Sequence, residues 1–419
     1  MKLFFSVFLF YTIFNNIFVK GSNTFGRDKR AVVKNFKNNW NTTIYYYIDL
    51  LLDHKPIEDA LNAISENTCL KFTKAELFHR SGKVGFHFKK GWSCFGADPN
   101  HNHDGFQNIQ LNSYCNTFIS VMRYVGISLG LQYEHQRPDR DNFVKIHLEH
   151  IRKTDQELFT KLKDTETLNV SYNYGSGMHF GKDDFSSGAF SSIDPIDIHY
   201  NSTIGQKNFD FNDYKMINAL HCSHVCPKKH DCFHGGYTDP KDCKTCVCPS
   251  IYDGDYCELL GESDTSCRNV YRSIQNKQES KHKAKGNKTC HFHFDVEPGY
   301  NVEINIISLK YTKSVDPDDS KHHSLHENHR CEEYEGLQVK YRDDKGPMGA
   351  LFCNDMKDYK IYSEGSSVDM RFIGLSDDDE VKFHVRKVFI DKRSIFRKAI
   401  DLVKGVRDTA TSIVGFCLG

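Results

Sequence analysis

The chain has 419 residues, a length that predicts two to four domains rather than one. Lys and Arg together number 55, as do Asp and Glu, so the formal net charge is zero. This balance gives no overall attraction to nucleic acid or to acidic lipid, and we expect neither as a partner. Apolar residues make up 39% of the chain, enough for ordinary hydrophobic cores.

Residues 1–21 have the pattern of a secretory signal peptide. A short basic start, Met1-Lys2, precedes an apolar run from Leu3 to Phe14, and Val19 and Gly21 suit the small-residue positions before a cleavage site. A membrane anchor is the alternative, but the run is short for a bilayer span, and no later stretch predicts a transmembrane segment. We therefore expect a secreted, extracellular protein whose 15 cysteines are candidates for disulfides.

Two further features fit secretion. Lys29-Arg30 is a dibasic pair, and processing at Arg30 would remove residues 22–30 as a short propeptide and leave Ala31 at the mature N-terminus. Of the Asn-X-Ser/Thr sequons, we expect glycosylation at Asn41, Asn201 and Asn287.

Residues 31–222 are poor in cysteine and predict a mixed α/β domain. "TTIYYYIDL" and "KVGFHF" are rich in β-branched or aromatic residues and predict strands. "KPIEDALNAISENTCLKF" has helical spacing, with Ile57, Leu61 and Ile64 on one face. "NTFISVMRYVGISLG" predicts a helix that ends near Gly130, because glycine readily takes the left-handed conformation of a helix end.

The segment from Arg123 to Arg140, "RYVGISLGLQYEHQRPDR", resembles the zinc-binding motif of the astacin family, H-E-x-x-H-x-x-G-x-x-H-E-x-x-R-x-D-R. In such motifs two histidines one helical turn apart face one metal, a glycine ends the helix, a third histidine follows, and the glutamate is the general base. The positions after the ligands match in register: Gly130, Glu134, Arg137, Asp139 and Arg140. The ligand positions hold Arg123, Ile127 and Tyr133, and the general-base position holds Tyr124.

The resemblance extends to the Met-turn, S-x-M-H-Y in astacins. "SGMHF" supplies Ser176, Met178 and His179, with Phe180 in place of the tyrosine. It implies an α+β metzincin-like protease domain with disulfides Cys69–Cys222 and Cys94–Cys115. Arginine and isoleucine offer zinc no electron pair, and tyrosine would have to ionise. We therefore predict no metal and no cofactor, although active family members hold zinc, and we interpret His135 and His179 as structural or solvated.

Residues 223–258 predict a small disulfide-rich module, because too little chain is present for a hydrophobic core. Its cysteines are Cys226, Cys232, Cys243, Cys246, Cys248 and Cys257. Their spacing resembles an EGF-like module; a zinc site of C-x-x-C type is the alternative.

Residues 267–388 predict an all-β sandwich. Period-two patterning recurs in "NVEINIISLKY", "EGLQVKYR", "SVDMRFIG" and "EVKFHVRKV". The cysteine order resembles a CUB domain and implies the disulfides Cys267–Cys290 and Cys331–Cys353. The tract "KHHSLHENHR", with His322, His323, His326 and His329, is interpreted as a solvated loop, with metal binding as the alternative.

The tail, residues 389–419, predicts an amphipathic helix flanked by basic residues. Its apolar stripe consists of Phe396, Ala399, Val403, Val406, Ala410, Ile413 and Cys417. Such a helix could dock on the protein itself, meet a partner helix or lie on a membrane surface. The pairs implied above leave Cys417 over, which predicts a disulfide-linked homodimer or a free or capped thiol.

Together these features predict an astacin-like protein without peptidase activity that binds extracellular or matrix proteins. An active zinc metalloendopeptidase with a non-standard metal site is the first alternative. A structural cuticle or matrix component is the second.

Overall fold

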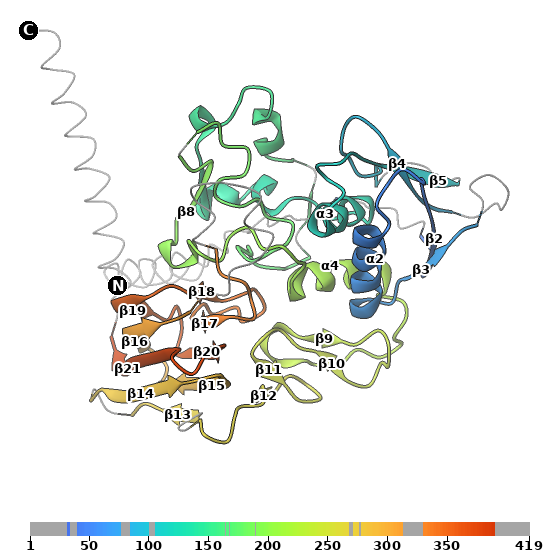
Figure 1. Ribbon diagram of the computed structural model, residues 1–419. Coiled ribbons are helices and arrows are strands. Elements are labelled where there is room, and N and C mark those ends of the chain that lie inside the picture. Colours follow the sequence, from blue (N-terminus) through green and yellow to red (C-terminus); the bar gives the residue numbers. More distant parts are fainter. Residues whose placement is uncertain are drawn as a thin grey trace, which may run out of the picture.

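The computed structural model describes residues 32–33, 40–76, 84–99, 105–163, 165–166, 168–188, 190–267, 271–275, 278–312 and 330–389. The predicted signal peptide, Arg30, the tract His322–His329 and Cys417 lie outside them. Within these ranges no helix is long and apolar enough to cross a membrane. Figure 1 shows an α/β part, a small disulfide-rich segment and a β-sheet-rich C-terminal part.

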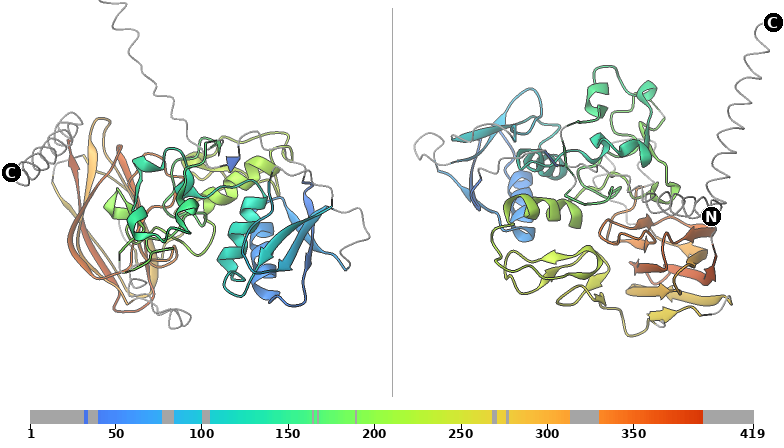
Figure 2. Two further views of the ribbon diagram at one scale, coloured as in Figure 1. Left: turned by 90° about the horizontal axis from the view of Figure 1, so that it is seen from above. Right: turned by 180° about the vertical axis from the view of Figure 1, so that it is seen from behind.

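The α/β part begins with a parallel four-stranded sheet in the order β3-β2-β4-β5. Its strands are β2 (Thr43–Ile48), β3 (Lys71–Lys74), β4 (Gly85–Lys90) and β5 (Phe106–Leu111). Helices α2 (Lys55–Asn67) and α3 (Phe118–Ser128) lie against one face of it (Figure 2). The predicted stripe Ile57, Leu61 and Ile64 is buried, which confirms the predicted helix, and the two predicted strands are present as β2 and β4.

The second half of this part is built mainly from short turns around a third helix, α4 (Phe211–His221). Two small antiparallel sheets pair β1 (Val32–Val33) with β7 (Thr165–Glu166) and β6 (Val144–Ile146) with β8 (Ile193–Pro195). The 3-10 turns are η1 (Glu134–Gln136), η2 (Arg140–Asn142), η3 (Leu148–His150), η4 (Gln156–Phe159) and η5 (Ile198–Tyr200). Capping by Asp210 starts α4: its side chain accepts from the amides of Asn212 and Asp213.

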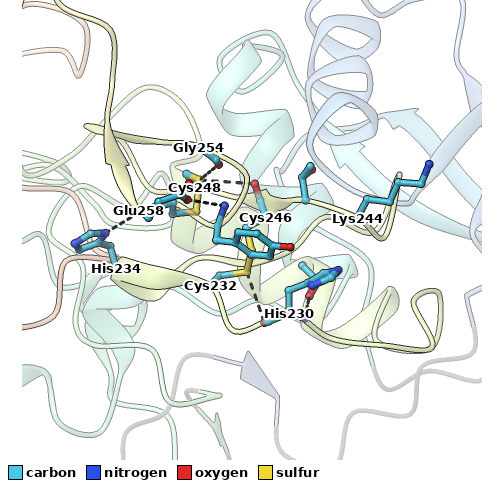
Figure 3. Close-up of a disulfide and its surroundings, with 12 residues drawn as sticks. His230, Cys232, His234, Lys244, Cys246, Cys248, Gly254 and Glu258 are labelled. Carbon is cyan, nitrogen blue, oxygen red and sulfur yellow. Dashed lines mark hydrogen bonds between the residues drawn. A yellow bond between two sulfur atoms is a disulfide. The ribbon is translucent and has the colours of Figure 1, made fainter.

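The disulfide-rich segment has no extended core and is held by three bonds: Cys226–Cys243, Cys232–Cys246 and Cys248–Cys257. It contains η6 (Phe233–Gly235), β9 (Tyr237–Thr238), β10 (Cys246–Val247), β11 (Tyr252–Asp253) and β12 (Leu259–Leu260). Figure 3 shows His230 and His234 in the surroundings of the Cys232–Cys246 bond. His234 hydrogen-bonds the Cys257 carbonyl at 2.7 Å, and His230 hydrogen-bonds the Cys243 carbonyl at 3.2 Å.

The C-terminal part is a β-sandwich. One sheet has the order β13-β15-β20-β17-β18 and the other β14-β21-β16-β19. Phe292 and Phe294 of the first meet Phe383 of the second with ring centroids 5.3 and 5.9 Å apart. The strands are β13 (Tyr271–Ser273), β14 (Ser280–Lys285), β15 (Lys288–Asp295), β16 (Asn301–Lys310), β17 (Gly336–Lys340), β18 (Ala350–Phe352), β19 (Met356–Tyr362), β20 (Ser367–Gly374) and β21 (Glu380–Val388).

The four patterned stretches named from the sequence form β16, β17, β20 and β21. Disulfides Cys267–Cys290 and Cys331–Cys353 lie in the sandwich, and Cys69–Cys222 and Cys94–Cys115 in the α/β part. These are the pairs that the resemblance implied.

The sandwich shares a hydrophobic core with the second half of the α/β part, which includes Phe159 and Tyr172. Backbone groups also meet across this boundary: the Cys331 amide donates to the Ser202 carbonyl at 2.7 Å, and Leu351 N donates to Thr203 Oγ1 at 2.9 Å. Met348 lies so close to Gly175 that a Cβ there would collide with it. The sandwich and the α/β part are therefore packed against each other and are not independent domains joined by a linker.

Candidate functional site

Helix α3 carries three of the four altered motif positions, because its apolar residues Val121, Met122 and Val125 are buried in the core and leave Arg123, Tyr124 and Ile127 only partly covered. The helix ends one residue before Leu129, and Gly130 then takes a φ of +98° that an L side chain rarely adopts. The chain reverses there and brings Tyr133 and η1 back alongside the Met-turn, whose Met178 carbonyl accepts from the Glu134 amide at 3.0 Å.

Arg123, at the first ligand position, binds the Met-turn directly. Its Nε donates to the Gly177 carbonyl at 2.7 Å and its Nη2 to the His179 carbonyl at 2.8 Å. The guanidinium carbon also lies 5.6 Å from the ring centroid of Phe180. A cation with no free electron pair therefore links α3 to the turn that lies beside the metal in active metzincins.

The other altered positions are apolar or stay neutral. Tyr133 packs on Phe180 with ring centroids 4.8 Å apart. Burial raises the pKa of Tyr133 well above its usual range and also raises that of Tyr124, so both remain phenols at neutral pH. Ile127 packs against the core and has no donor atom. These residues do not fit a zinc ion at the motif.

Neither nearby histidine offers a replacement ligand. Both nitrogens of buried His179 are engaged: Nδ1 donates to the Phe180 carbonyl at 2.7 Å, so Nε2 accepts from the Tyr172 hydroxyl at 2.6 Å. His135 is equally buried; its Nε2 donates to the Leu158 carbonyl at 3.2 Å and its Nδ1 accepts from the Phe180 amide. Burial lowers the pKa of His179 to about 3, so this ring is a neutral structural element. The two rings are structural and not solvated.

The retained second half of the motif forms a buried charge network. The Arg137 side chain is 1% exposed; it donates to Glu134 at 2.7 Å and to both oxygens of Asp139 at 2.9 and 3.0 Å. Glu134 Oε1 also accepts from the Asn173 amide at 2.9 Å. Val32, which follows the predicted mature terminus Ala31, pairs with Leu131, three residues before Glu134. Ala31 itself lies outside the described residues.

The Met-turn is fixed from its far side by α4. The Asp213 carboxylate accepts from Ser176 Oγ at 2.6 Å and from the Gly177 amide at 2.8 Å. The turn geometry therefore depends on a buried aspartate and on Arg123, and neither contact needs a metal.

Away from this region, the predicted glycosylation sites Asn41, Asn201 and Asn287 are all exposed.

A different group of ligand-type side chains was missed from the sequence: His147, Glu149 and His150, on and just before η3. One potential ligand atom from each residue lies within 4.8 Å of the others, and no further group of this kind occurs among the residues that the structure places. Its signal, H-x-E-H, was present in the sequence. The spacing is not H-E-x-x-H, and the residues lie on a single 3-10 turn, so this group is not a displaced copy of the helical motif.

Residues 32–222 match the family model "Astacin", which describes a family of peptidases. The zinc metalloproteinase nas-37 of Caenorhabditis elegans is 30% identical over 350 residues, which cover 82% of this chain and 42% of that protein. The zinc metalloproteinase dpy-31 of Haemonchus contortus is 32% identical over 243 residues, covering 56% of this chain and 44% of that protein. The chain thus spans less than half the length of these two relatives.

Among solved structures, high choriolytic enzyme 1, a hatching-enzyme zinc-protease from the medaka Oryzias latipes, is similar to this chain. It is 28% identical, with a TM-score of 0.38, over 45% of this chain and 94% of that one.

Proposed function

Residues 32–222 form an astacin-family metalloproteinase domain, and from this premise we propose that the protein lacks peptidase activity and acts by binding other extracellular proteins. The observation that carries the proposal is the Arg123 guanidinium, which is held by two Met-turn carbonyls at the first ligand position of the motif. A zinc ion there would face a fixed positive charge and would lack all three imidazole ligands.

The catalytic argument points the same way. Metal-assisted peptide hydrolysis needs a general base to take a proton from the attacking water. The base position holds Tyr124, a phenol whose pKa burial raises further, so it cannot accept a proton at neutral pH.

Binding is the remaining use of the domains. The disulfide-rich segment and the sandwich are proposed to be EGF-like and CUB modules, and both contact the α/β part through hydrogen bonds. Matrix proteins, or the substrates and regulators of active relatives, are the proposed partners. The disulfides are consistent with a secreted protein, as the start of the sequence predicts.

The experiment compares the purified, processed protein with a fourfold variant that restores the motif, Arg123→His, Tyr124→Glu, Ile127→His and Tyr133→His. We expect no cleavage of a peptide library or a denatured protein by the parent chain. Single restorations should also be inactive, because such residues act as a unit. Chelator-sensitive cleavage by the parent chain would contradict the proposal and support a non-standard active metalloendopeptidase.

The binding experiment uses the same two purified proteins, the parent chain and the fourfold variant. We expect the parent chain to bind immobilised matrix proteins saturably in the presence of a chelator. If it binds none of them, and none of the substrates of an active relative, a structural matrix component becomes the better hypothesis.

We also propose that Cys417, the cysteine left outside the seven bonds, links two copies of the chain. Non-reducing electrophoresis should show a dimer for the parent chain and a monomer for Cys417→Ser. A parent chain that migrates as a monomer would instead indicate a free or capped thiol.

A further inference from the structure

We infer that His147, Glu149 and His150 form a binding site for a divalent transition-metal ion such as Zn²⁺, separate from the altered astacin motif. The three residues follow β6, at the point where its antiparallel pairing with β8 ends, and the His147 amide donates to the Ser192 carbonyl at 2.9 Å. None of them contacts Arg123, Tyr133 or the Met-turn through a hydrogen bond that the structure describes.

Toward residues outside the cluster, each imidazole is engaged through one nitrogen, and its other nitrogen is left for an ion. His150 Nδ1 lies 2.8 Å from the Ser191 carbonyl, which can only accept, so this nitrogen carries the proton and Nε2 keeps its electron pair. His147 Nε2 lies 3.0 Å from Asp194 Oδ2, which in the same way places a proton on that nitrogen. A carbonyl or carboxylate behind each imidazole is the arrangement that orients histidine ligands in metal sites.

The remaining nitrogen of His147 has an unfavourable neighbour in the absence of a cation. Its Nδ1 lies 3.2 Å from Glu149 Oε1, so a neutral ring would set a lone pair against a carboxylate oxygen. Either a second proton on the ring or a metal ion between the two atoms removes this conflict. Two atoms bound tetrahedrally at about 2.0 Å from zinc lie about 3.3 Å apart, close to the spacing seen here.

The geometry also suits uptake from solution. The His147 side chain is 12% exposed, which fixes its ring, whereas that of Glu149 is 68% exposed and free to rotate onto an ion. The two imidazoles stack with centroids 5.1 Å apart, and the Phe190 ring stacks on His150 at 5.1 Å. Two imidazoles and one carboxylate are a donor set that zinc accepts, with water completing the coordination.

The test is zinc titration of the purified, chelator-treated full chain by calorimetry. His322, His323, His326 and His329 are first replaced by Asn, so that this tract cannot contribute zinc binding. We expect one Zn²⁺ per chain. His150→Asn keeps an amide donor toward Ser191 but removes the ligand nitrogen, and Glu149→Gln removes the exposed carboxylate. Each should weaken zinc binding by more than the roughly 10–100-fold that the loss of an outer partner costs.

Two controls make the result decisive. His224→Ala removes an exposed histidine outside the cluster and should leave zinc binding unchanged. Tyr133→Phe removes the last oxygen at the motif's ligand positions and should also leave it unchanged. Zinc uptake that survives both cluster substitutions, or no uptake at all, overturns this inference. Uptake lost only in Tyr133→Phe would overturn it and also contradict the proposed loss of the motif's metal.

Discussion

The astacin-like segment divides at Tyr133 into two regions that relate differently to the family motif. Before this point, every position that would ligate or activate a metal has changed, and Arg123 has gained contacts of its own with the Met-turn. After it, the motif residues Glu134, Arg137 and Asp139 are all present and paired. The difference teaches that the Met-turn and the segment after Tyr133 are held by contacts of charged side chains.

The two regions therefore make separable contributions to stability. In the first, a cation replaces the link that a shared metal would make between α3 and the Met-turn. In the second, the network stabilises the turn only as long as all its members are present, because a buried charge without its partner is costly. Substitutions in each region test this division.

The largest effect is expected from Arg137→Met in the second region. It would leave Glu134, 2% exposed, without its 2.7 Å partner, and breaking a buried pair in this way costs about 3–5 kcal/mol. Urea unfolding followed by Trp40 fluorescence measures the loss, since Trp40 is buried in the core of the α/β part. The matched control is Arg152→Met: the Arg152 side chain is 65% exposed, and such an exposed pair, here with Asp155, contributes about 0–1 kcal/mol. Equal effects of the two substitutions would show that the network is not a buried unit.

Substitutions in the first region should reduce the free energy of unfolding by less. Arg123→Met removes two charge-assisted hydrogen bonds to Met-turn carbonyls, for an expected loss of about 1.5–3 kcal/mol in the free energy of unfolding. Arg123→Lys should recover only part of it, because an ammonium lacks the planar pair of donors that reaches both carbonyls. If Arg123→Met leaves the free energy of unfolding unchanged, the guanidinium does not link α3 to the Met-turn.

The sequence was sufficient for the main helices, for four of the sandwich strands and for the altered motif. Patterning in the sequence predicted α2, α3 and the sandwich strands β16, β17, β20 and β21, but not the long strand β15. Shorter or more exposed strands, such as β13 and β19, carry weak patterns and were missed.

The partners of the site residues could not be predicted. Arg123 meets carbonyls 54 and 56 residues further along the chain, and backbone acceptors leave no mark in the sequence. The partners of the His147 cluster could not be predicted either. Ser191 and Asp194 orient its rings, and both lie more than forty positions away in the sequence.

Acid should weaken the junction of the two regions, where His135 and His179 are buried. Burial lowers the folded-state pKa of His179 to about 3 and that of His135 well below its usual value, whereas both titrate near 6.5 when unfolded. Through these two rings the unfolded chain binds more protons, so their contribution to stability is fully present above about pH 6.5 and is lost as the pH decreases toward 3. Burial raises the pKa of Glu134 to about 7 and that of Asp213 to about 6, and these carboxyls shift stability in the opposite direction. Well below pH 6.5, each ring contributes a loss of about 1.4 kcal/mol per pH unit.

Unfolding midpoints at pH 7, 6 and 5, read from Trp40, measure this slope. His179→Gln should reduce it by the share of one ring, whereas the exposed control His224→Ala should not. If the dependence of stability on pH is unchanged in His179→Gln, groups other than His179 cause the acid sensitivity.

The smallest effect concerns the contrast between the motif, which has a family pattern without ligands, and the His147 cluster, which has ligands without a family pattern. If zinc binds the cluster, Asp194 acts only through His147, whose Nε2 it holds at 3.0 Å. Asp194→Asn keeps an oxygen that can accept this proton but removes the negative charge that makes the imidazole a better donor to metal. Zinc affinity should therefore fall about tenfold, which is about 1.4 kcal/mol, with one ion still bound per chain. Asp183→Asn, a nearby carboxylate without this contact, should bind zinc like the parent chain. If Asp194→Asn instead weakens zinc binding as much as His150→Asn does, Asp194 is itself a zinc ligand and does not act through His147.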